Sequence, residues 1–245
     1  MKTLVILPTY NEAENLPKIV PEILRYLPNI EESCLLIVDD HSPDGTGEIA
    51  DSYSAQNPAV KVLHRNSKLG LGSAYVEGFG YALKHNFETI VQMDADFSHL
   101  PSYLPQFFQA LGSADVAIGS RYIAGGGIQG WPYHRLLLSR FANLYARAVL
   151  GVSLTDLTGG FRCFRAKALT KLDFNQQFPG SRGRGRFSSR GYSFQIELNY
   201  RFVQNGFRFA EIPIIFPDRT LGRSKMSIGV IWEAFCIVWK LRFLS

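Results

Sequence analysis

The sequence predicts an α/β protein with a mostly parallel central sheet and helices on both faces. In the first 120 residues, short apolar segments rich in Val, Ile and Leu alternate with segments of helical periodicity. The apolar segments are continuous rather than alternating, which is typical of strands buried on both faces. Polar residues gather directly after several of them. Repeated alternation of strand and helix indicates crossover connections, and these make a parallel sheet.

Five strands are expected where the apolar segments lie. These segments are residues 2–7, 35–38, 60–63, 89–93 and 115–119. Between them, apolar residues recur at a spacing of three and four, which indicates helices. Five helices are expected. The first carries the apolar residues from Leu16 to Leu27, the second runs from about Thr46 to Gln56, and the third runs from Gly70 to about His85. The fourth begins at Pro101 and the fifth after Pro132.

Polar clusters follow four of these strands, at residues 9–12, 39–44, 94–98 and 120–122. In parallel sheets, ligands bind beyond the carboxyl ends of the strands. Four unrelated solvated loops would have no reason to be polar and acid-rich at the same end of the sheet. The pattern therefore predicts one shared site at this edge.

The most specific of these clusters is Asp94-Ala95-Asp96, which follows the apolar strand 89–93. Two carboxylates so close repel each other and are costly to desolvate, so a cation is expected between them. Hard oxygen ligands suit Mg²⁺ or Mn²⁺, which keeps several waters and bridges to phosphates. Taken alone, the same three residues are also consistent with a solvated surface loop.

Other patterns exclude alternatives. The chain has no G-x-x-x-x-G-K-[ST] sequence, and the glycines at 70 and 72 lack the full dinucleotide-binding order. The three cysteines have neither metal spacing nor an even number, so a reducing compartment is expected. The apolar run ended by Pro8 is too short for a signal-peptide core. The histidines, among them His99, have no partner at metal spacing and are expected in loops or on the surface.

Positive charge is concentrated near the C-terminus. The net charge is +5, and residues 177–245 contain 11 Lys and Arg against 4 Asp and Glu. This asymmetry favours an anionic partner: phosphate, a membrane surface or nucleic acid. Residues 178–190 are rich in Gly, Ser and Arg, which predicts a flexible basic loop. It is either a tolerated surface insertion or a contact for anionic lipid headgroups, for the phosphate of a ligand or for nucleic acid.

The last segment, residues 228–244, is mostly apolar but is interrupted by Glu233, Lys240 and Arg242. A membrane-spanning helix needs about 20 apolar residues. Gly229, Glu233, Cys236 and Lys240 share one helical face, so the pattern predicts an amphipathic helix lying in a membrane interface. A helix packed on the folded domain is the alternative.

Several motifs in order resemble the family-2 glycosyltransferases of the GT-A fold. They are Pro8-Thr9-Tyr10-Asn11-Glu12, Val38-Asp39-Asp40, Gly70-Leu71-Gly72, Asp94-Ala95-Asp96, Gly119-Ser120-Arg121-Tyr122 and Asp156-Leu157-Thr158-Gly159-Gly160-Phe161-Arg162. The resemblance covers nearly the whole chain. Within the family it is strongest to enzymes that move mannose from GDP-mannose to polyprenyl (dolichyl) phosphate, with inversion at the sugar carbon. Transfer of glucose from UDP-glucose to the same acceptor is the alternative within the family.

The resemblance also implies roles for particular residues. Those matching the nucleoside site are Pro8, Tyr10, Glu12, Val38 and Asp40. Those matching the diphosphate and metal loop are Asp94, Ala95 and Asp96, with Asp94 and Asp96 as the metal ligands. Those matching the donor phosphates are Arg121, Arg219 and Lys225, and those matching the acceptor phosphate are Arg121, Arg135 and Ser139. Asp96 and Arg121 are the residues expected to act in catalysis, whereas Arg140 and Arg147 on the same helix as Arg135 are expected to be solvated.

The chemistry fits these residue types. A phosphate monoester acceptor is largely dianionic at pH 7, because its second pKa is about 6. It needs no general base, so no carboxylate or His is expected in that role. The domain expected from the resemblance spans residues 1–225, with residues 226–245 as a membrane-associating helix. The expected location is the cytoplasmic face of a membrane, and a membrane-anchoring subunit is a candidate partner. No nucleic-acid partner is expected, although a non-catalytic nucleotide or nucleic-acid binding module is the alternative of another class.

Overall fold

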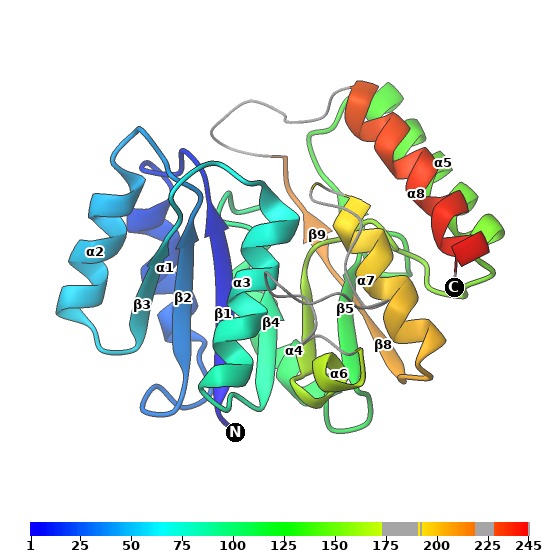
Figure 1. Cartoon of the computed structure of the whole chain (residues 1–245). Helices are drawn as coiled ribbons and strands as arrows, with labels where there is room; N and C mark the ends of the chain where they lie inside the picture. The colour runs from blue at the N-terminus through cyan, green and yellow to red at the C-terminus, as the bar shows by residue number, and fades with distance from the viewer. Residues whose placement is uncertain (173–190, 192, 219–227, 245) are drawn as a thin grey trace.

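The structure, a computed structural model, describes residues 1–172, 191, 193–218 and 228–244. Within this part of the chain, a seven-stranded sheet has the order β3-β2-β1-β4-β7-β5-β8 (Figure 1). Its strands are β1 (Thr3–Thr9), β2 (Cys34–Asp39), β3 (Val60–His64), β4 (Thr89–Gln92), β5 (Val116–Ser120), β7 (Arg162–Arg165) and β8 (Phe209–Pro213). All five expected strands are confirmed within two residues at each end.

The sheet is mostly parallel, as expected. β7 is the exception in the described part of the chain, because it runs antiparallel to both β4 and β5. It therefore brings its N-terminal end to the edge where the other strands have their carboxyl ends. The sequence did not predict β7, which is short and begins and ends with arginine. A second, two-stranded parallel sheet joins β6 (Gly127–Ile128) to β9 (Ile215–Phe216).

The continuous apolar strands are buried on both faces. In β1, Val5 and Leu7 pack into one hydrophobic cluster, while Leu4 and Ile6 pack into the other. Such a strand needs helices on both sides. The first cluster is covered by α1 (Leu16–Arg25), α2 (Thr46–Gln56), a 3-10 turn (Pro101–Tyr103) and α4 (Leu104–Ala110). The second is covered by α3 (Leu71–Lys84), α6 (Lys167–Lys171) and α7 (Ser193–Gln204).

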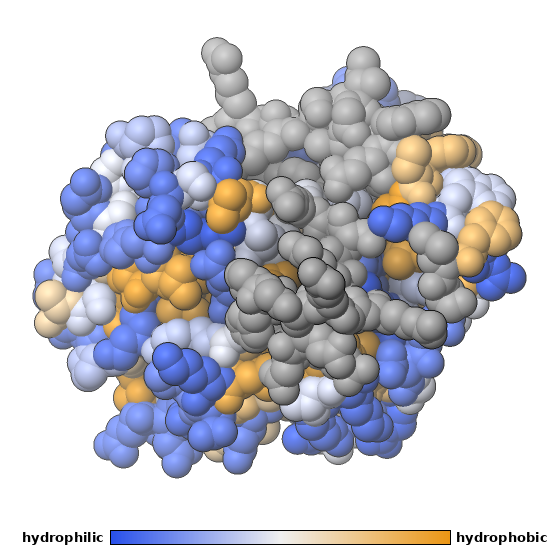
Figure 2. All heavy atoms as spheres, in the orientation of Figure 1, coloured by the Kyte–Doolittle hydropathy of each residue, from blue (hydrophilic) through white to orange (hydrophobic). Residues whose placement is uncertain are grey.

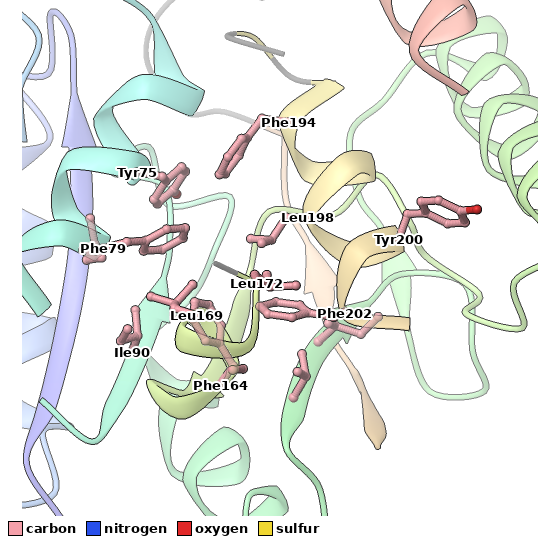
Figure 3. Packing of buried hydrophobic residues seen from close by; sticks show 14 of the residues in the cluster. Tyr75, Phe79, Ile90, Phe164, Leu169, Leu172, Phe194, Leu198, Tyr200 and Phe202 are labelled. Atoms are coloured by element: carbon pink, nitrogen blue, oxygen red, sulfur yellow. The ribbon is translucent and has the colours of Figure 1, made fainter. Parts of the chain in front are cut away.

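Aromatic rings fill the second cluster between α3 and α7 (Figure 3). Tyr75 on α3 stacks on Phe194 at a centroid distance of 6.2 Å. Phe79, one turn further along α3, meets the edge of Phe164 at 5.5 Å. These contacts fix α7 over the sheet and place the hydroxyl of Tyr75 at the site edge.

Two long helices, α5 (Tyr133–Leu150) and α8 (Ile228–Leu244), lie side by side at one end of the sheet (Figure 1). The rings of Tyr145 and Phe235 stack at 4.9 Å, and Ile237 and Val238 are buried. The C-terminal segment is therefore helical and packs on the domain. Gly229 and Glu233, on which its expected polar face depends, lie outside the residues whose side chains are described. No helix in the described part of the chain is both long and apolar enough to span a membrane.

Candidate active site

The polar clusters after β1 and β2 meet at one edge of the sheet, as expected from their sequence positions. Thr9 and Asp39 are register partners, and the Thr9 hydroxyl donates to Oδ1 of Asp39 at 3.1 Å. The next residues are also joined, because the backbone N–H of Asn11 donates to the hydroxyl of Ser42 at 3.0 Å. The two loops thus form one connected wall of the site.

Asp40 is buried and its carboxylate is fully engaged. It accepts from Nη1 of Arg65 at 2.7 Å and from the backbone N–H groups of Leu69 and Gly70, both at 2.8 Å. In this arrangement Asp40 holds the loop that leads into α3. Its expected contact with a nucleoside stays a prediction.

The other residues matched to the nucleoside differ in what they offer a ligand. Pro8 and Val38 are buried in the sheet, and Val38 has no exposed surface, so their expected contact with a nucleoside stays a prediction. Tyr10 is half-buried, with Nζ of Lys68 3.6 Å from its ring centroid. Glu12 accepts a hydrogen bond from Asn15 at 2.7 Å. The Lys68–Tyr10 contact is a cation–π interaction that holds a positive charge beside the loop after β1.

The acidic loop after β4 is ordered by hydrogen bonds from its own residues and from Tyr75 on α3. The hydroxyl of Tyr75 donates to Oδ1 of the half-buried Asp94 at 3.2 Å. The backbone N–H of Ser98 donates to Oδ1 of the buried Asp96 at 3.1 Å, and the Ser98 hydroxyl donates to the same oxygen. Phe97 adopts a left-handed conformation with φ of 61°, which tightens this turn. Ser98 therefore orients Asp96.

His99 lies in a loop, one of the two expected positions, but it is buried there rather than exposed at the surface. Its Nδ1 accepts the backbone N–H of Asp94 at 2.8 Å, and its ring stacks on Phe161 at 4.9 Å. Burial lowers the pKa of His99, and the nearby Asp94 and Asp96 only partly oppose this. An accepting Nδ1 requires the neutral ring with its proton on Nε2. The sequence missed His99 because a lone histidine carries no spacing signal.

Arg121 lies at the end of β5, where its guanidinium forms a buried bidentate pair with Asp156. The distances are 2.7 Å from Nε to Oδ2 and 2.8 Å from Nη2 to Oδ1. Burial would raise the pKa of Asp156, but Arg121 outweighs it and holds that pKa below its ordinary value. The same Nη2 donates to the hydroxyl of Thr158 at 2.8 Å. Arg121 is thus held rigidly at the site edge.

Two of the three residues matched to the acceptor phosphate, Arg121 and Arg135, lie near the ring of Trp131. Cζ of Arg135 lies 3.8 Å and Cζ of Arg121 5.8 Å from the ring centroid of Trp131. Ser139, one turn after Arg135 on α5, accepts from the hydroxyl of Tyr122 at 2.7 Å. Arg135 also pairs with Asp218 at 3.0 Å, with Asp218 partly exposed. Arg219 and Lys225, matched to the donor phosphates, lie outside the described residues.

Arg162, at the start of β7, is a buried cation that the sequence did not single out. Its side chain donates to the side-chain oxygens of Gln92 at 3.2 Å and Gln195 at 2.5 Å, and to the carbonyl of Gly159 at 2.6 Å. Burial lowers its pKa to about 10, although the guanidinium remains protonated at neutral pH. The side chain connects β4, α7 and the loop before β7, so it fixes the floor of the site.

Asp94 and Asp96 fit an Mg²⁺ or Mn²⁺ ion held mainly through phosphates. The described residues contain no group of three or more His, Cys, Asp or Glu side chains that could hold a metal by themselves. Two oxygen ligands from one tight turn are what a phosphate-bridged divalent ion needs from a protein. The acidic loop is linked toward Arg121 by His99, whose Nδ1 accepts from the backbone of Asp94 and whose ring also meets Phe216 at 5.7 Å. Phe216 in turn lies 5.2 Å from Cζ of Arg121.

An acidic loop and buried arginines at the carboxyl edge of a mostly parallel sheet are typical of enzymes that bind phosphorylated ligands. The sequence model of glycosyl transferase family 2 matches residues 4–173, and the chain belongs to this family. It is 46% identical over 245 residues to polyprenol monophosphomannose synthase from Mycolicibacterium smegmatis, covering 98% of this chain and 88% of that protein. It is 44% identical over 234 residues to undecaprenyl-phosphate mannosyltransferase from Micrococcus luteus, covering 96% and 91%.

Solved structures support the GT-A fold. Glucosyl-3-phosphoglycerate synthase from Mycobacterium tuberculosis, in complex with phosphoglyceric acid, superposes with a TM-score of 0.68 at 17% identity. The alignment covers 98% of this chain and 79% of that one. The same synthase in complex with Mn²⁺ and UDP-glucose gives a TM-score of 0.68 at 18% identity, covering 98% and 78%. At this identity the similarity concerns the fold alone.

Proposed function

We propose that this protein transfers mannose from a nucleoside-diphosphate sugar to a polyprenyl phosphate. The observation that carries the proposal is a chain of contacts through His99 and Phe216 that links the acidic loop of Asp94 and Asp96 to Arg121, which shares the Trp131 ring with Arg135. The acidic loop can hold a divalent ion that serves the diphosphate leaving group. The arginines can bind a phosphate acceptor. The names of the two relatives at 44% and 46% identity support mannose and a polyprenyl phosphate.

The side chains perform the reaction mainly by positioning. Arg121 and Arg135 hold the acceptor phosphate, with the Ser139 hydroxyl beside them, so that a phosphate oxygen faces the sugar. That oxygen forms a bond to the anomeric carbon from one side as the bond to the diphosphate breaks on the other. The configuration is therefore inverted. The acceptor is already deprotonated, so no side chain has to remove a proton.

We propose GDP-mannose as the donor and Mg²⁺ or Mn²⁺ as the cofactor. Asp94 and Asp96 would hold the metal, which stabilises the charge on the departing diphosphate when bound. The solved relative with bound Mn²⁺ and UDP-glucose supports a divalent ion in this fold. No described side chain distinguishes guanine from uracil, so UDP-glucose is the competing donor.

The test offers the purified protein each labelled donor, a short polyprenyl phosphate and either metal, with Asp96→Ala as the variant. Asp51→Ala is the matched control, because Asp51 is an exposed carboxylate whose partner is His64 on β3. Mannolipid formed from GDP-mannose alone, lost in Asp96→Ala and retained in Asp51→Ala, is the expected result. Transfer from UDP-glucose would overturn the donor, and no lipid product from either donor would overturn the activity.

We also propose that the protein works as a peripheral protein on the cytoplasmic face of a membrane. Large apolar side chains are exposed along α5 and α8, part of them visible at the right of Figure 2. They are Tyr133, Leu137, Leu138, Phe141, Leu144, Phe235, Trp239 and Phe243. Exposed apolar patches of this kind mark interaction surfaces. A membrane-anchoring subunit is the competing occupant.

This proposal is tested with Phe141→Ser/Leu144→Ser, since Phe141 is 66% and Leu144 64% exposed. Co-sedimentation with phosphatidylcholine vesicles is expected to fall at least tenfold, because burying each apolar side chain contributes about 1.5–3 kcal/mol. Wild-type protein that does not bind such vesicles would contradict the membrane proposal.

A further inference from the structure

A polar cavity of about 470 Å³ lies on the flank of α5, beside the site described above. Three arginines line it: Arg121 from the end of β5, and Arg140 and Arg147 from α5. Tyr122, Asn143 and Thr155 contribute further polar groups. No carboxylate is among the described residues that line the cavity.

The charge in this cavity is not balanced. Arg121 is neutralised by Asp156, with Nε 2.7 Å from Oδ2. The side chains of Arg140 and Arg147, in contrast, have neither an ion pair nor a hydrogen bond with any described residue. The Nε of Arg147 is shielded from solvent and has no hydrogen-bond acceptor within the described chain. A shielded guanidinium nitrogen without an acceptor is costly, so a bound anion is favoured here.

The shape favours phosphate. Arginine grips a phosphate with parallel N–H groups of its planar fork. Arg140 and Arg147 are seven residues apart, so they lie on one side of α5 two turns apart. Leu144 lies between them on the same side and also lines the cavity, although it is 64% exposed. The mouth of the cavity therefore adjoins the apolar surface of α5 and α8.

We propose that Arg140 and Arg147 form a second phosphate site, distinct from the acceptor site of Arg135 and Ser139. Its ligand is the phosphate of a lipid headgroup, held while Leu144 and Phe141 enter the apolar layer. The same chemistry would accept a free phosphate anion. The lipid source rests on the membrane association proposed above, whereas the phosphate site itself does not. Arg140 is exposed, in agreement with the expectation of a solvated side chain, whereas Arg147 is half-buried.

Vesicle sedimentation tests the lipid source, with phosphatidylcholine vesicles compared with vesicles that also contain phosphatidylglycerol. The double variant Arg140→Gln/Arg147→Gln should lose about 30-fold of its affinity for the anionic vesicles, about fivefold for each cation. The matched control Lys18→Gln/Arg25→Gln removes two exposed charges from α1, which covers the other face of the sheet. Arg140→Lys/Arg147→Lys keeps the charge but removes the fork.

A second measurement uses inorganic phosphate. Phosphate should raise the thermal unfolding midpoint of the wild-type protein above that in chloride of equal ionic strength, and the Gln double variant should lose this increase. If the Gln double variant loses the phosphate-induced rise in the midpoint but binds anionic vesicles unchanged, the phosphate site is supported. Its ligand is then a free phosphate. If neither readout depends on the two arginines, or if the α1 control loses as much vesicle affinity, the proposal is wrong. Binding to neutral vesicles and sugar transfer report separately on the functions proposed above.

Discussion

The backbone N–H of Asp94 donates to Nδ1 of His99 across a distance of 2.8 Å. This hydrogen bond joins the start of the acidic loop to its end. The His99 ring is itself held in place by stacking on Phe161. The buried His99 ring therefore fixes the conformation of the loop that carries Asp94 and Asp96. The loop needs a neutral histidine, and burial favours that form by lowering the pKa.

Replacing His99 tests this arrangement. His99→Ala should lower kcat/KM by about 10- to 100-fold and raise the metal concentration needed for half-maximal rate, the usual cost of losing a residue that supports metal ligands. His99→Asn should recover much of the loss, since its Oδ1 can accept the same N–H. The measurement is a metal titration of transfer. His64→Asn, at an exposed site, is the control; equal effects of all three changes would contradict the role of His99.

The Arg121–Asp156 pair should dominate the stability of the site edge. Asp156→Ala leaves a buried guanidinium without its counter-charge, and such breaks cost about 3–5 kcal/mol. The free energy of unfolding from urea titration measures this. Asp218→Ala breaks the more exposed pair with Arg135 and should cost less than about 1 kcal/mol. Similar losses in the two variants would show that burial does not decide the strength of the first pair.

The same pair gives the stability a dependence on acid pH. The pKa of Asp156 is lower in the folded protein than the value of about 3.9 for an unfolded chain. Its stabilisation is therefore complete above about pH 4 and is lost as the pH falls from there toward the folded pKa. Asp156→Asn should unfold with a shallower dependence on pH over this range. An unchanged slope would place the acid sensitivity in other carboxylates.

Transfer should follow the ionisation of the acceptor rather than of a catalytic base. We expect log kcat/KM to fall with a slope of about one per pH unit below about pH 6, where the acceptor phosphate takes up a proton. A phosphonate acceptor with a higher pKa should shift this limb upward by the same amount. If the limb stays in place, a side chain of the protein carries the titration and the mechanism without a base is wrong.

A change at Arg65, the partner of Asp40, tests whether Asp40 supports the loop before α3 or contacts the donor. Arg65→Lys keeps the charge beside Asp40 but removes the fork that also reaches Glu77 and Ser73. We expect this change to lower stability by about 1–3 kcal/mol and to raise KM for the donor, because the loop before α3 loosens. An unchanged KM together with lowered stability would confine Asp40 and Arg65 to a structural role.

Much of the fold follows from local patterns. Continuous apolar segments such as residues 35–38 determine strands buried on two faces, and the helices between them make those strands parallel. Parallel strands place Thr9, Asp39 and Asp94 at one edge, so the acidic side of the candidate site could be predicted from the chain order alone. The expected role of Arg135 and Ser139 depended on the motif resemblance. Their spacing of one helical turn shows only that they share a face of the helix.

The position of β7 and the partners of the buried polar residues were decided by the tertiary structure, because residue spacing in the sequence does not encode them. β7 enters the sheet antiparallel and brings Arg162 beside Gln92, residues 70 positions apart in sequence. Burial turns Asp40 and Arg121 into members of ion pairs, and it makes His99 a neutral hydrogen-bond acceptor. The sequence by itself determined which residues could carry charge at the site edge. Their partners were decided by long-range packing, because desolvation and hydrogen bonding depend on neighbours that are distant along the chain.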